Sequence, residues 1–277
     1  PIILGTALAL HETQISWSLF TAMLLACLAL QIATNLFNEY YDFKRGLDTA
    51  ESVGIGGGIV RHGLKPQNVL ATAILLYIVA AIIGVYICMN SSWWLVVIGV
   101  IGMAIGYLYT GGPLPIAYTP FGELFSGLAM GTGFVLISFY IQTLSLTTVS
   151  ILISVPIGIL VGAINMSNNI RDIEEDIKGG RKTLPILLGR DKAVTTLAIA
   201  LGVSYVWIVM LVLFGYISPW ALLVFLGIRK PITAIKSFRL GATQPKYMRE
   251  AMKSTAMTNT IFGLLLSAGF IIHYFFI

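Results

Sequence analysis

The chain has 277 residues, of which 57% are hydrophobic and only 10% are charged. Soluble domains carry roughly 25% charged residues, so this composition excludes an ordinary water-soluble globular protein. The net charge is +5, but aromatic residues are not interleaved with the basic ones, which argues against a nucleic-acid-binding module and against nucleic acid as a partner.

Long apolar runs succeed one another along the chain, at 18–37, 69–89, 92–109, 123–143, 147–170, 193–214, 217–228 and 256–277. Most approach the roughly 20 residues that a helix needs to cross the hydrocarbon core of a bilayer. They lack the alternating pattern of barrel strands, which leaves helices as the membrane-spanning element. The sequence therefore predicts an all-α, polytopic membrane helical bundle that forms a single integral-membrane domain over residues 1–277. The apolar stretch before His11 is short, so we expect the first helix to be truncated in this chain.

Lysine and arginine occur in three segments only, at 44–65, 171–192 and 229–253. Four apolar runs separate the first segment from the second, and two separate the second from the third. Even numbers of crossings return a chain to the same side, so all three segments are expected at one membrane face. The excess of positive charge in cytoplasmic loops makes that face the cytoplasmic side of the cell membrane. The third segment is predicted to contact membrane lipid.

Most of the carboxylates gather beside the first two basic segments. Nine of the twelve acidic residues lie there: Glu39, Asp42, Asp48, Glu51, Asp172, Glu174, Glu175, Asp176 and Asp191. Topology depends on Lys and Arg and requires no carboxylates. This concentration therefore calls for a chemical explanation.

The first acidic segment closes a long apolar helix. Asn38 and Asp42 are four residues apart and are predicted to project from one helical face. Gly46 is predicted to end the helix and to let the chain turn back, with Asp48 following.

The second acidic segment has the same order of residues. Asn168, Asp172 and Asp176 follow at i, i+4 and i+8, which predicts a stripe of oxygen-bearing side chains on one helix. Glycines and basic residues follow, as in the first segment, and this similarity indicates a weak internal duplication that places two carboxylate stripes opposite each other. Such stripes could hold Mg²⁺ ions that bridge a diphosphate, with neighbouring Arg and Lys neutralising the rest of its charge. The alternative for either segment alone is a solvated charged loop, but polar clusters in membrane helices are rare without a function.

The glycine-rich segment 54–63 resembles a phosphate-binding loop but has neither the GxGxxG spacing nor a following Lys-Ser/Thr pair. It is either a simple connection or a loop from which Arg61 reaches a diphosphate. Segment 107–118 is uncharged and contains three tyrosines and two prolines. It is either an interfacial aromatic anchor or the rim of a pocket for an aromatic acceptor or an allylic cation. Glu123 is an isolated acid and a candidate for binding the acceptor.

Three motifs together make the chain resemble the UbiA superfamily of intramembrane prenyltransferases. They are NEYYDFKRGLD at 38–48, YTGGPLPIAY at 109–118 and DIEEDIKGGRKTL at 172–184. The similarity is greatest to the branch that prenylates 1,4-dihydroxy-2-naphthoate in menaquinone synthesis. Glu39 departs from the aspartate usual in the superfamily at that position.

The resemblance implies a bundle of nine transmembrane helices whose cytoplasmic ends cap a chamber open to lipid. It also implies a Mg²⁺-dependent transfer of a polyprenyl group from a polyprenyl diphosphate to 1,4-dihydroxy-2-naphthoate, with loss of CO₂ and diphosphate. The implied metal ligands and catalytic residues are Asn38, Asp42 and Asp48 for one ion, and Asp172 and Asp176 for the other. The expected diphosphate-binding residues are Arg61, Lys44, Lys182 and Asn168, and the expected acceptor-binding residues are Tyr109, Tyr118, Glu123 and Tyr40.

Two other functions remain open. Another aromatic acceptor, such as 4-hydroxybenzoate or homogentisate, would use the same motifs. A membrane transporter with repeated halves would carry its ionisable residues near the middle of the bilayer. The acids here lie at the ends of the apolar runs, which favours the transferase.

Overall fold

The computed structural model of the chain describes residues 1–47, 57–241 and 244–276, and over these residues it contains helices and no strand. This confirms the predicted all-α fold. The chain divides into two compact units. The first unit comprises Pro1–Ser16, Gly122–Ile173 and Leu184–Ile277, and the second comprises Trp17–Phe121 and Glu174–Thr183.

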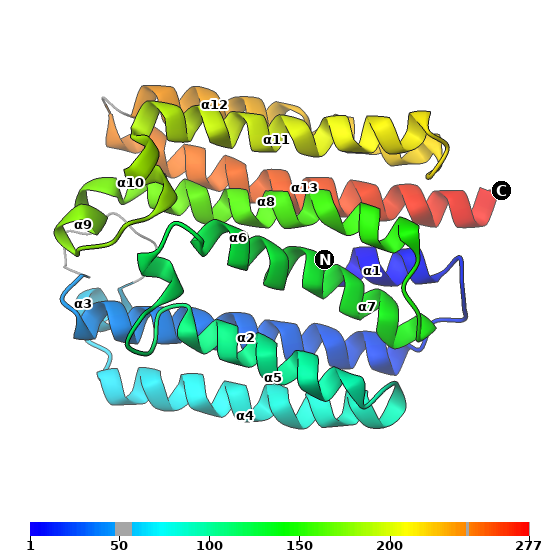
Figure 1. Ribbon diagram of the computed structural model, residues 1–277, viewed down its shortest axis with the longest axis horizontal. Coiled ribbons are helices and arrows are strands. Elements are labelled where there is room, and N and C mark those ends of the chain that lie inside the picture. The colour runs from blue at the N-terminus through cyan, green and yellow to red at the C-terminus, as the bar shows by residue number, and fades with distance from the viewer. Residues whose placement is uncertain (48–56, 242–243, 277) are drawn as a thin grey trace. The chain divides into compact units, whose positions relative to one another are not determined.

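The second unit is built on three long helices that lie side by side in Figure 1. They are α2 (Trp17–Lys44), α4 (Pro66–Asn90) and α5 (Trp94–Leu108). Three short helices complete it: α3 (Gly58–His62), the 3₁₀ helix η1 (Ile116–Tyr118) and α9 (Ile173–Lys178), of which the first residue belongs to the first unit. The ring of Phe37 on α2 makes edge-to-face contacts with Tyr77 of α4 and Tyr107 of α5, at centroid distances of 5.0 and 5.5 Å. These contacts fix the three helices to one another close to the C-terminal part of α2.

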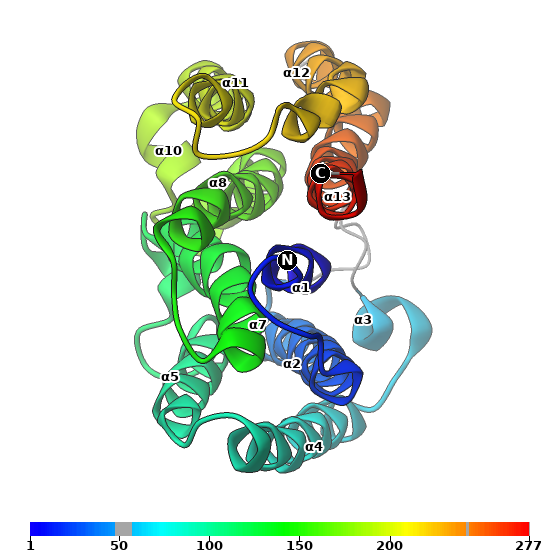
Figure 2. The ribbon, with the colours of Figure 1, turned by 90° about the vertical axis from the view of Figure 1, so that its right-hand side faces the viewer.

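The first unit contains the remaining helices. They are α1 (Ile2–Ala9), the 3₁₀ helix η3 (Pro219–Gly227), the π-helix η2 (Gly127–Gly133), α6 (Gly122–Ser126), α7 (Phe134–Thr143), α8 (Thr148–Arg171), α10 (Leu184–Leu188), α11 (Arg190–Leu213), α12 (Arg229–Gly241) and α13 (Pro245–Phe276). Viewed along the helices in Figure 2, α1 lies beside α7 and α13, and α12 lies beside α11 and α13.

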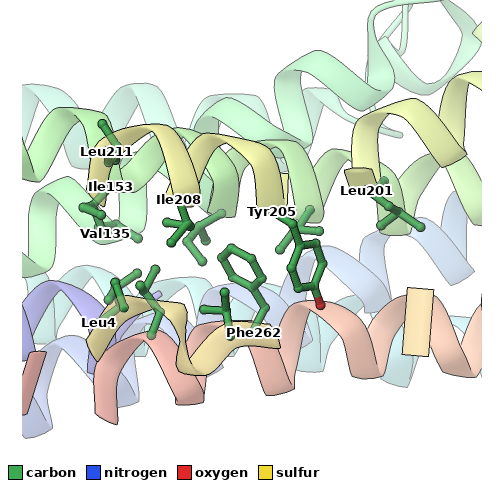
Figure 3. Close-up of a cluster of buried hydrophobic side chains, with 14 of the residues drawn as sticks. Leu4, Val135, Ile153, Leu201, Tyr205, Ile208, Leu211 and Phe262 are labelled. Atoms are coloured by element: carbon green, nitrogen blue, oxygen red, sulfur yellow. The ribbon is translucent and has the colours of Figure 1, made fainter. Parts of the chain in front are cut away.

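Helices α8, α11 and α13 enclose the apolar core of this unit, which Figure 3 shows in detail. Tyr205 and Ile208 of α11 are almost fully buried, and so is Phe262 of α13. The rings of Tyr205 and Phe262 meet edge to face with centroids 5.1 Å apart. Ile153 from α8 and Leu4 from α1 close the core, so α1 is an integral part of this unit.

Six of the described helices are long and apolar enough to cross a membrane: Trp17–Lys44, Pro66–Asn90, Gly122–Thr143, Thr148–Arg171, Arg190–Leu213 and Lys246–Phe276. They correspond to six of the predicted apolar runs. The run at 92–109 forms the 15-residue α5, and the run at 217–228 forms η3, which α12 follows at once. The count of nine spans stays an expectation. Helix α4 leaves Leu75, Ile78 and Ile82 exposed, a side-chain row suited to lipid tails.

One helix pair of the first unit is packed at very short range. A Cβ added at Gly131, in η2, would lie 2.5 Å from the Cα of Gly158 and 2.8 Å from the carbonyl oxygen of Ile157 in α8. Small residues at such a contact let two membrane helices approach backbone to backbone. The π-helical turn at this contact carries the chain from Glu123, at the start of the span, toward α7.

Candidate active site

Asp42 lies at the C-terminal end of α2, where the chain makes a glycine-closed turn. Gly46 adopts a left-handed conformation with φ of 71°. The amide of Leu47 donates to the Asp42 carbonyl at 2.9 Å, and the amide of Gly46 donates to the Phe43 carbonyl at 3.0 Å. This pair of bonds is the Schellman motif, which favours glycine because the turn needs positive φ. The predicted helix end at Gly46 is confirmed.

Asp176 lies near the end of α9, and the chain after it makes a second turn of the same type. Gly180 has φ of 72°, the amide of Arg181 donates to the Asp176 carbonyl at 2.9 Å, and the amide of Gly180 donates to the Ile177 carbonyl at 3.1 Å. Each aspartate is thus followed by an apolar residue, a lysine, one further residue and the closing glycine. The similarity of the two acidic segments therefore extends to their backbone hydrogen bonds.

The two aspartates meet at one guanidinium group. Arg181 donates through one terminal nitrogen to Asp42 Oδ1 at 2.6 Å and through the other to Asp176 Oδ1 at 3.0 Å. The three side chains are largely buried, with exposed fractions of 12% for Arg181, 12% for Asp42 and 5% for Asp176. Burial lowers the pKa of Arg181, but the charges of Asp42 and Asp176 outweigh it and raise the pKa overall, so the cation is permanent.

Tyr118 lies against this acid pair. The guanidinium of Arg181 and that of Arg45 are each 5.2 Å from the centroid of the Tyr118 ring. Arg45 also donates to the carbonyls of Thr110 and Gly112, at 2.5 and 3.1 Å, which ties the 110–112 segment to the end of α2. The tyrosine-rich segment, interpreted as either an interfacial anchor or a pocket rim, is thereby joined to the first acidic segment.

The structure describes most of the other residues that were predicted for the site. Asn38, Lys44, Lys182 and Arg61 are exposed. The Tyr40 ring contacts that of Tyr41, and the carbonyl of Tyr109 accepts from the amide of Ala117. Asp48 and the first part of the glycine-rich segment lie outside the described residues.

Glu39 has a different partner from the neighbouring aspartate. Its Oε1 accepts a hydrogen bond from the amide of Ile59 at 2.8 Å, at the start of α3. Helix α3 carries Arg61, whose amide donates to the carbonyl of Gly57. Glu39 therefore holds α3, the helix that carries Arg61, against α2.

The predicted stripe of Asn168, Asp172 and Asp176 is not one continuous helical face. Helix α8 ends at Arg171, Asp172 has a non-helical conformation, and α9 begins at Ile173. The i, i+4, i+8 argument was wrong here because it assumed an unbroken helix. Asp172 forms a two-pronged ion pair with the adjacent Arg171.

Glu123, on α6, makes polar contacts with α8. Asn169 Nδ2 donates to Glu123 Oε1 at 2.8 Å, and a Cβ added at Gly162 would lie 2.8 Å from the Glu123 carbonyl oxygen. Asn165 lies between these two contacts along the same stretch of α8. Within the described part of the chain, Glu123 Oε2 and Asn165 Nδ2 are buried and have no hydrogen-bond partner. An acceptor and a donor thus stay unsatisfied in one buried region.

The acidic side chains of the site are the donors available to the implied magnesium. Over the residues that the structure describes, no group of three or more His, Cys, Asp or Glu side chains is placed to hold a metal. Asp42 and Asp176 nevertheless both form an ion pair with the same cation, Arg181. Their carboxylate oxygens are the hard ligands that magnesium prefers. Mg²⁺ is commonly held by one or two carboxylates together with substrate phosphates, so this pair fits the ion.

The sequence interpretation gave no individual role to four residues, which are Arg45 and Arg181 in the second unit and Asn165 and Asn169 in the first. Arg45 and Arg181 were overlooked in favour of the neighbouring lysines, Lys44 and Lys182. Each arginine lies next to the glycine that closes the turn after an aspartate. A basic residue at that place is a signal that can be found in the sequence. Asn165 and Asn169 lie four apart on α8, a spacing that predicts a shared face within an apolar helix.

The chain was compared with known proteins. The family model described as "UbiA prenyltransferase family" matches residues 1–274. The 1,4-dihydroxy-2-naphthoate octaprenyltransferase of Bacillus subtilis (strain 168) is 64% identical over 275 residues, covering 99% of this chain and 88% of that protein.

Solved structures agree in fold. A UbiA homolog from Archaeoglobus fulgidus bound to DMAPP and Mg²⁺ aligns with a TM-score of 0.60 at 16% identity, covering 99% of this chain and 93% of that one. A UbiA homolog from Aeropyrum pernix K1 aligns with a TM-score of 0.66 at 15% identity, covering 98% and 97%. The chain therefore belongs to the UbiA prenyltransferase family, and it is a multi-pass membrane protein.

Proposed function

We propose that this protein transfers a polyprenyl group from a polyprenyl diphosphate to 1,4-dihydroxy-2-naphthoate, with loss of CO₂ and diphosphate, in menaquinone synthesis. The observation that carries the proposal is the 64% identity, over nearly the whole chain, to a protein named for this acceptor. The converging pair Asp42 and Asp176 supports a diphosphate chemistry. The family match over 1–274 supports one integral-membrane domain. We place the basic face of this domain in the cytoplasm because cytoplasmic loops carry an excess of Lys and Arg.

The carboxylates are proposed to hold Mg²⁺. Asn38, Asp42 and Asp48 would bind one ion, and Asp172 and Asp176 the other. Magnesium bound there would stabilise the charge that develops on the leaving diphosphate. A family member of the same fold was solved with Mg²⁺ and an allylic diphosphate, which supports the assignment.

Basic and aromatic side chains of this chain would hold the donor. The diphosphate oxygens would accept hydrogen bonds from Arg61, Lys44, Lys182 and Asn168. When the C1–O bond of the prenyl group breaks, the electron pair leaves with the diphosphate and an allylic cation remains. Tyr118, with Tyr109 and Tyr40 nearby in the sequence motifs, would present ring faces that stabilise such a cation. Exclusion of water protects the cation until the acceptor attacks.

The acceptor is proposed to bind at Glu123. A ring hydroxyl both donates and accepts hydrogen bonds, so it can satisfy Glu123 Oε2 and Asn165 Nδ2 together. Donation of the hydroxyl proton toward a carboxylate makes the naphthoate ring more electron-rich. The ring carbon that carries the carboxylate then forms the new C–C bond, and CO₂ leaves, returning the electron pair to the ring.

An acceptor panel tests the function directly. Purified protein in lipid nanodiscs is supplied with Mg²⁺, geranylgeranyl diphosphate and, in parallel, 1,4-dihydroxy-2-naphthoate, 4-hydroxybenzoate or homogentisate. We expect diphosphate release and a prenylated naphthoquinol with the naphthoate alone. Turnover of another acceptor in its place would refute the naphthoate assignment, and the absence of turnover with every acceptor by folded protein would refute the transferase.

Replacing Glu123 tests the acceptor site. Glu123→Gln keeps the shape but removes the charge, and the loss of a hydrogen bond to a charged group is expected to lower kcat/KM for the naphthoate by about 10- to 100-fold. The KM for the prenyl diphosphate should stay unchanged. The exposed Glu12→Gln, also in the first unit, is the matched control. An equal rise in both KM values would contradict a role confined to the acceptor.

A further inference from the structure

Arg181 is the feature that the proposed roles leave unused. It is a largely buried arginine that bonds the two aspartates assigned to the metal. We propose that Arg181 takes the place of the metal in the ligand-free protein, and that joint binding of metal and diphosphate transfers its guanidinium from Asp42 and Asp176 to the diphosphate. This inference rests on the proposed function, since it concerns the same site.

The geometry makes the two cations competitors. Arg181 uses Oδ1 of Asp42 and Oδ1 of Asp176, at 2.6 and 3.0 Å. A magnesium ion binds carboxylate oxygens at roughly 2.0–2.1 Å, so an ion held by Oδ1 of either aspartate would compete with the guanidinium nitrogen that now bonds that oxygen. A dication and a guanidinium a few ångströms apart in a largely buried site also repel each other strongly. The arginine must therefore leave its present position when the ion enters.

Arg181 offsets the cost of burying the two carboxylates. Two buried carboxylates without a counter-charge would be costly, because desolvation of each would not be offset. One guanidinium neutralises half of that charge and satisfies an oxygen on each aspartate. The structure thus contains its own substitute cation, supplied from the turn that Gly180 closes directly after Asp176.

The binding of metal alone should therefore cost more free energy than the binding of metal together with diphosphate. Metal alone would break the ion pairs of Arg181 with Asp42 and Asp176 and would supply no anion in exchange. A diphosphate supplies phosphate oxygens, which suit the planar fork of arginine and favour bidentate contact. The displaced cation regains its bonds only when both ligands are present, so each ligand should strengthen binding of the other.

The surroundings of Arg181 allow its side chain to rotate while the backbone of the loop keeps its hydrogen bonds. The Arg181 amide stays bonded to the Asp176 carbonyl, and the Lys182 amide donates to the Tyr118 carbonyl at 2.9 Å. The Tyr118 ring, 5.2 Å from the guanidinium, offers a surface along which that group can rotate. Arg45 contacts the same ring and holds it in place while Arg181 moves.

The test measures metal binding rather than turnover. Mn²⁺ serves as the probe, its free concentration followed by electron paramagnetic resonance, with purified protein in nanodiscs and no acceptor. Each titration is run with and without geranyl thiodiphosphate, a donor analogue that resists ionisation. The proteins are wild type, Arg181→Met and the control Arg239→Met, which removes an exposed charge of α12.

We expect Arg181→Met to bind Mn²⁺ alone on the order of tenfold more tightly than wild type, because its competitor is gone. The strengthening of Mn²⁺ binding by the diphosphate analogue should shrink by a similar factor, and Arg239→Met should match wild type. Arg181→Lys keeps a charge without the fork and should fall between the two, which also gives a readout if the methionine variant folds poorly.

Two results overturn the inference, and they differ from each other. If both Arg181 variants bind Mn²⁺ alone no more tightly than wild type, while the analogue strengthens binding in all proteins, the metal site stands but Arg181 does not compete for it. If wild type binds no Mn²⁺ even with the analogue, the metal assignment itself fails and the inference fails with it.

Discussion

Asp42→Asn and Asp176→Asn are each expected to lower kcat by about 100-fold or more, since stabilisation of a leaving group by metal is worth several kcal/mol. Asparagine keeps the size of the side chain but removes the negative charge that attracts Mg²⁺. The backbone caps at both positions use the main-chain carbonyls of these residues, so the folds of the two turns should survive. Diphosphate release with saturating substrates measures the effect.

The double variant and a control sharpen this test. Because both aspartates serve one site, the Asp42→Asn/Asp176→Asn protein should lose little more than either single variant. Asp191→Asn, the same change at an exposed position of α11, should keep full activity. Asp172→Asn is expected to resemble the site variants. Near-normal rates in the Asp42 and Asp176 variants would show that these carboxylates do not hold the metal.

Gly131→Ala should lower the midpoint of thermal unfolding by about 4 °C or more. The new Cβ would meet the Gly158 Cα at 2.5 Å and the Ile157 carbonyl oxygen at 2.8 Å. Both are backbone atoms, which cannot rotate away as a side chain can, so η2 and α8 must separate. Differential scanning fluorimetry of the detergent-solubilised protein measures the change.

Gly202→Ala on α11 is the matched control for this change. A Cβ there meets no atom within 4 Å, and alanine is the better helix former by up to about 1 kcal/mol. The control should therefore unfold at the same temperature as wild type or slightly above it. If both alanine variants unfold at the wild-type temperature, the close contact between η2 and α8 does not limit stability.

The main helices could be predicted from the sequence because hydrophobic runs near bilayer length admit few alternatives. Gly46 was correctly predicted to end α2 because its turn depends on local backbone geometry. The stripe through Asp172 failed for the opposite reason. A residue spacing does not reveal where a helix stops, and α8 ends one residue before Asp172.

The contacts of Arg181 and Arg45 could not be foreseen from composition. A sequence shows that basic residues lie near acidic ones, but which guanidinium bridges Asp42 and Asp176 depends on two turns 134 positions apart in the chain. The π-helical turn at Gly127–Gly133 was likewise not predicted, since it follows from the close approach to α8. The features that could not be predicted are contacts between segments that lie far apart in the sequence.

The glycine-closed turn after Asp176 affects the rate at which metal and diphosphate can bind. Because the amide of Arg181 remains bonded to the Asp176 carbonyl, the exchange of cations requires torsions of one side chain and no local unfolding. Side-chain rotations take picoseconds to nanoseconds when unhindered, whereas loop and domain rearrangements take microseconds to milliseconds. Loading of the site is therefore expected to follow ligand arrival without a lag, which leaves bond breaking or product departure into the lipid to set the turnover rate.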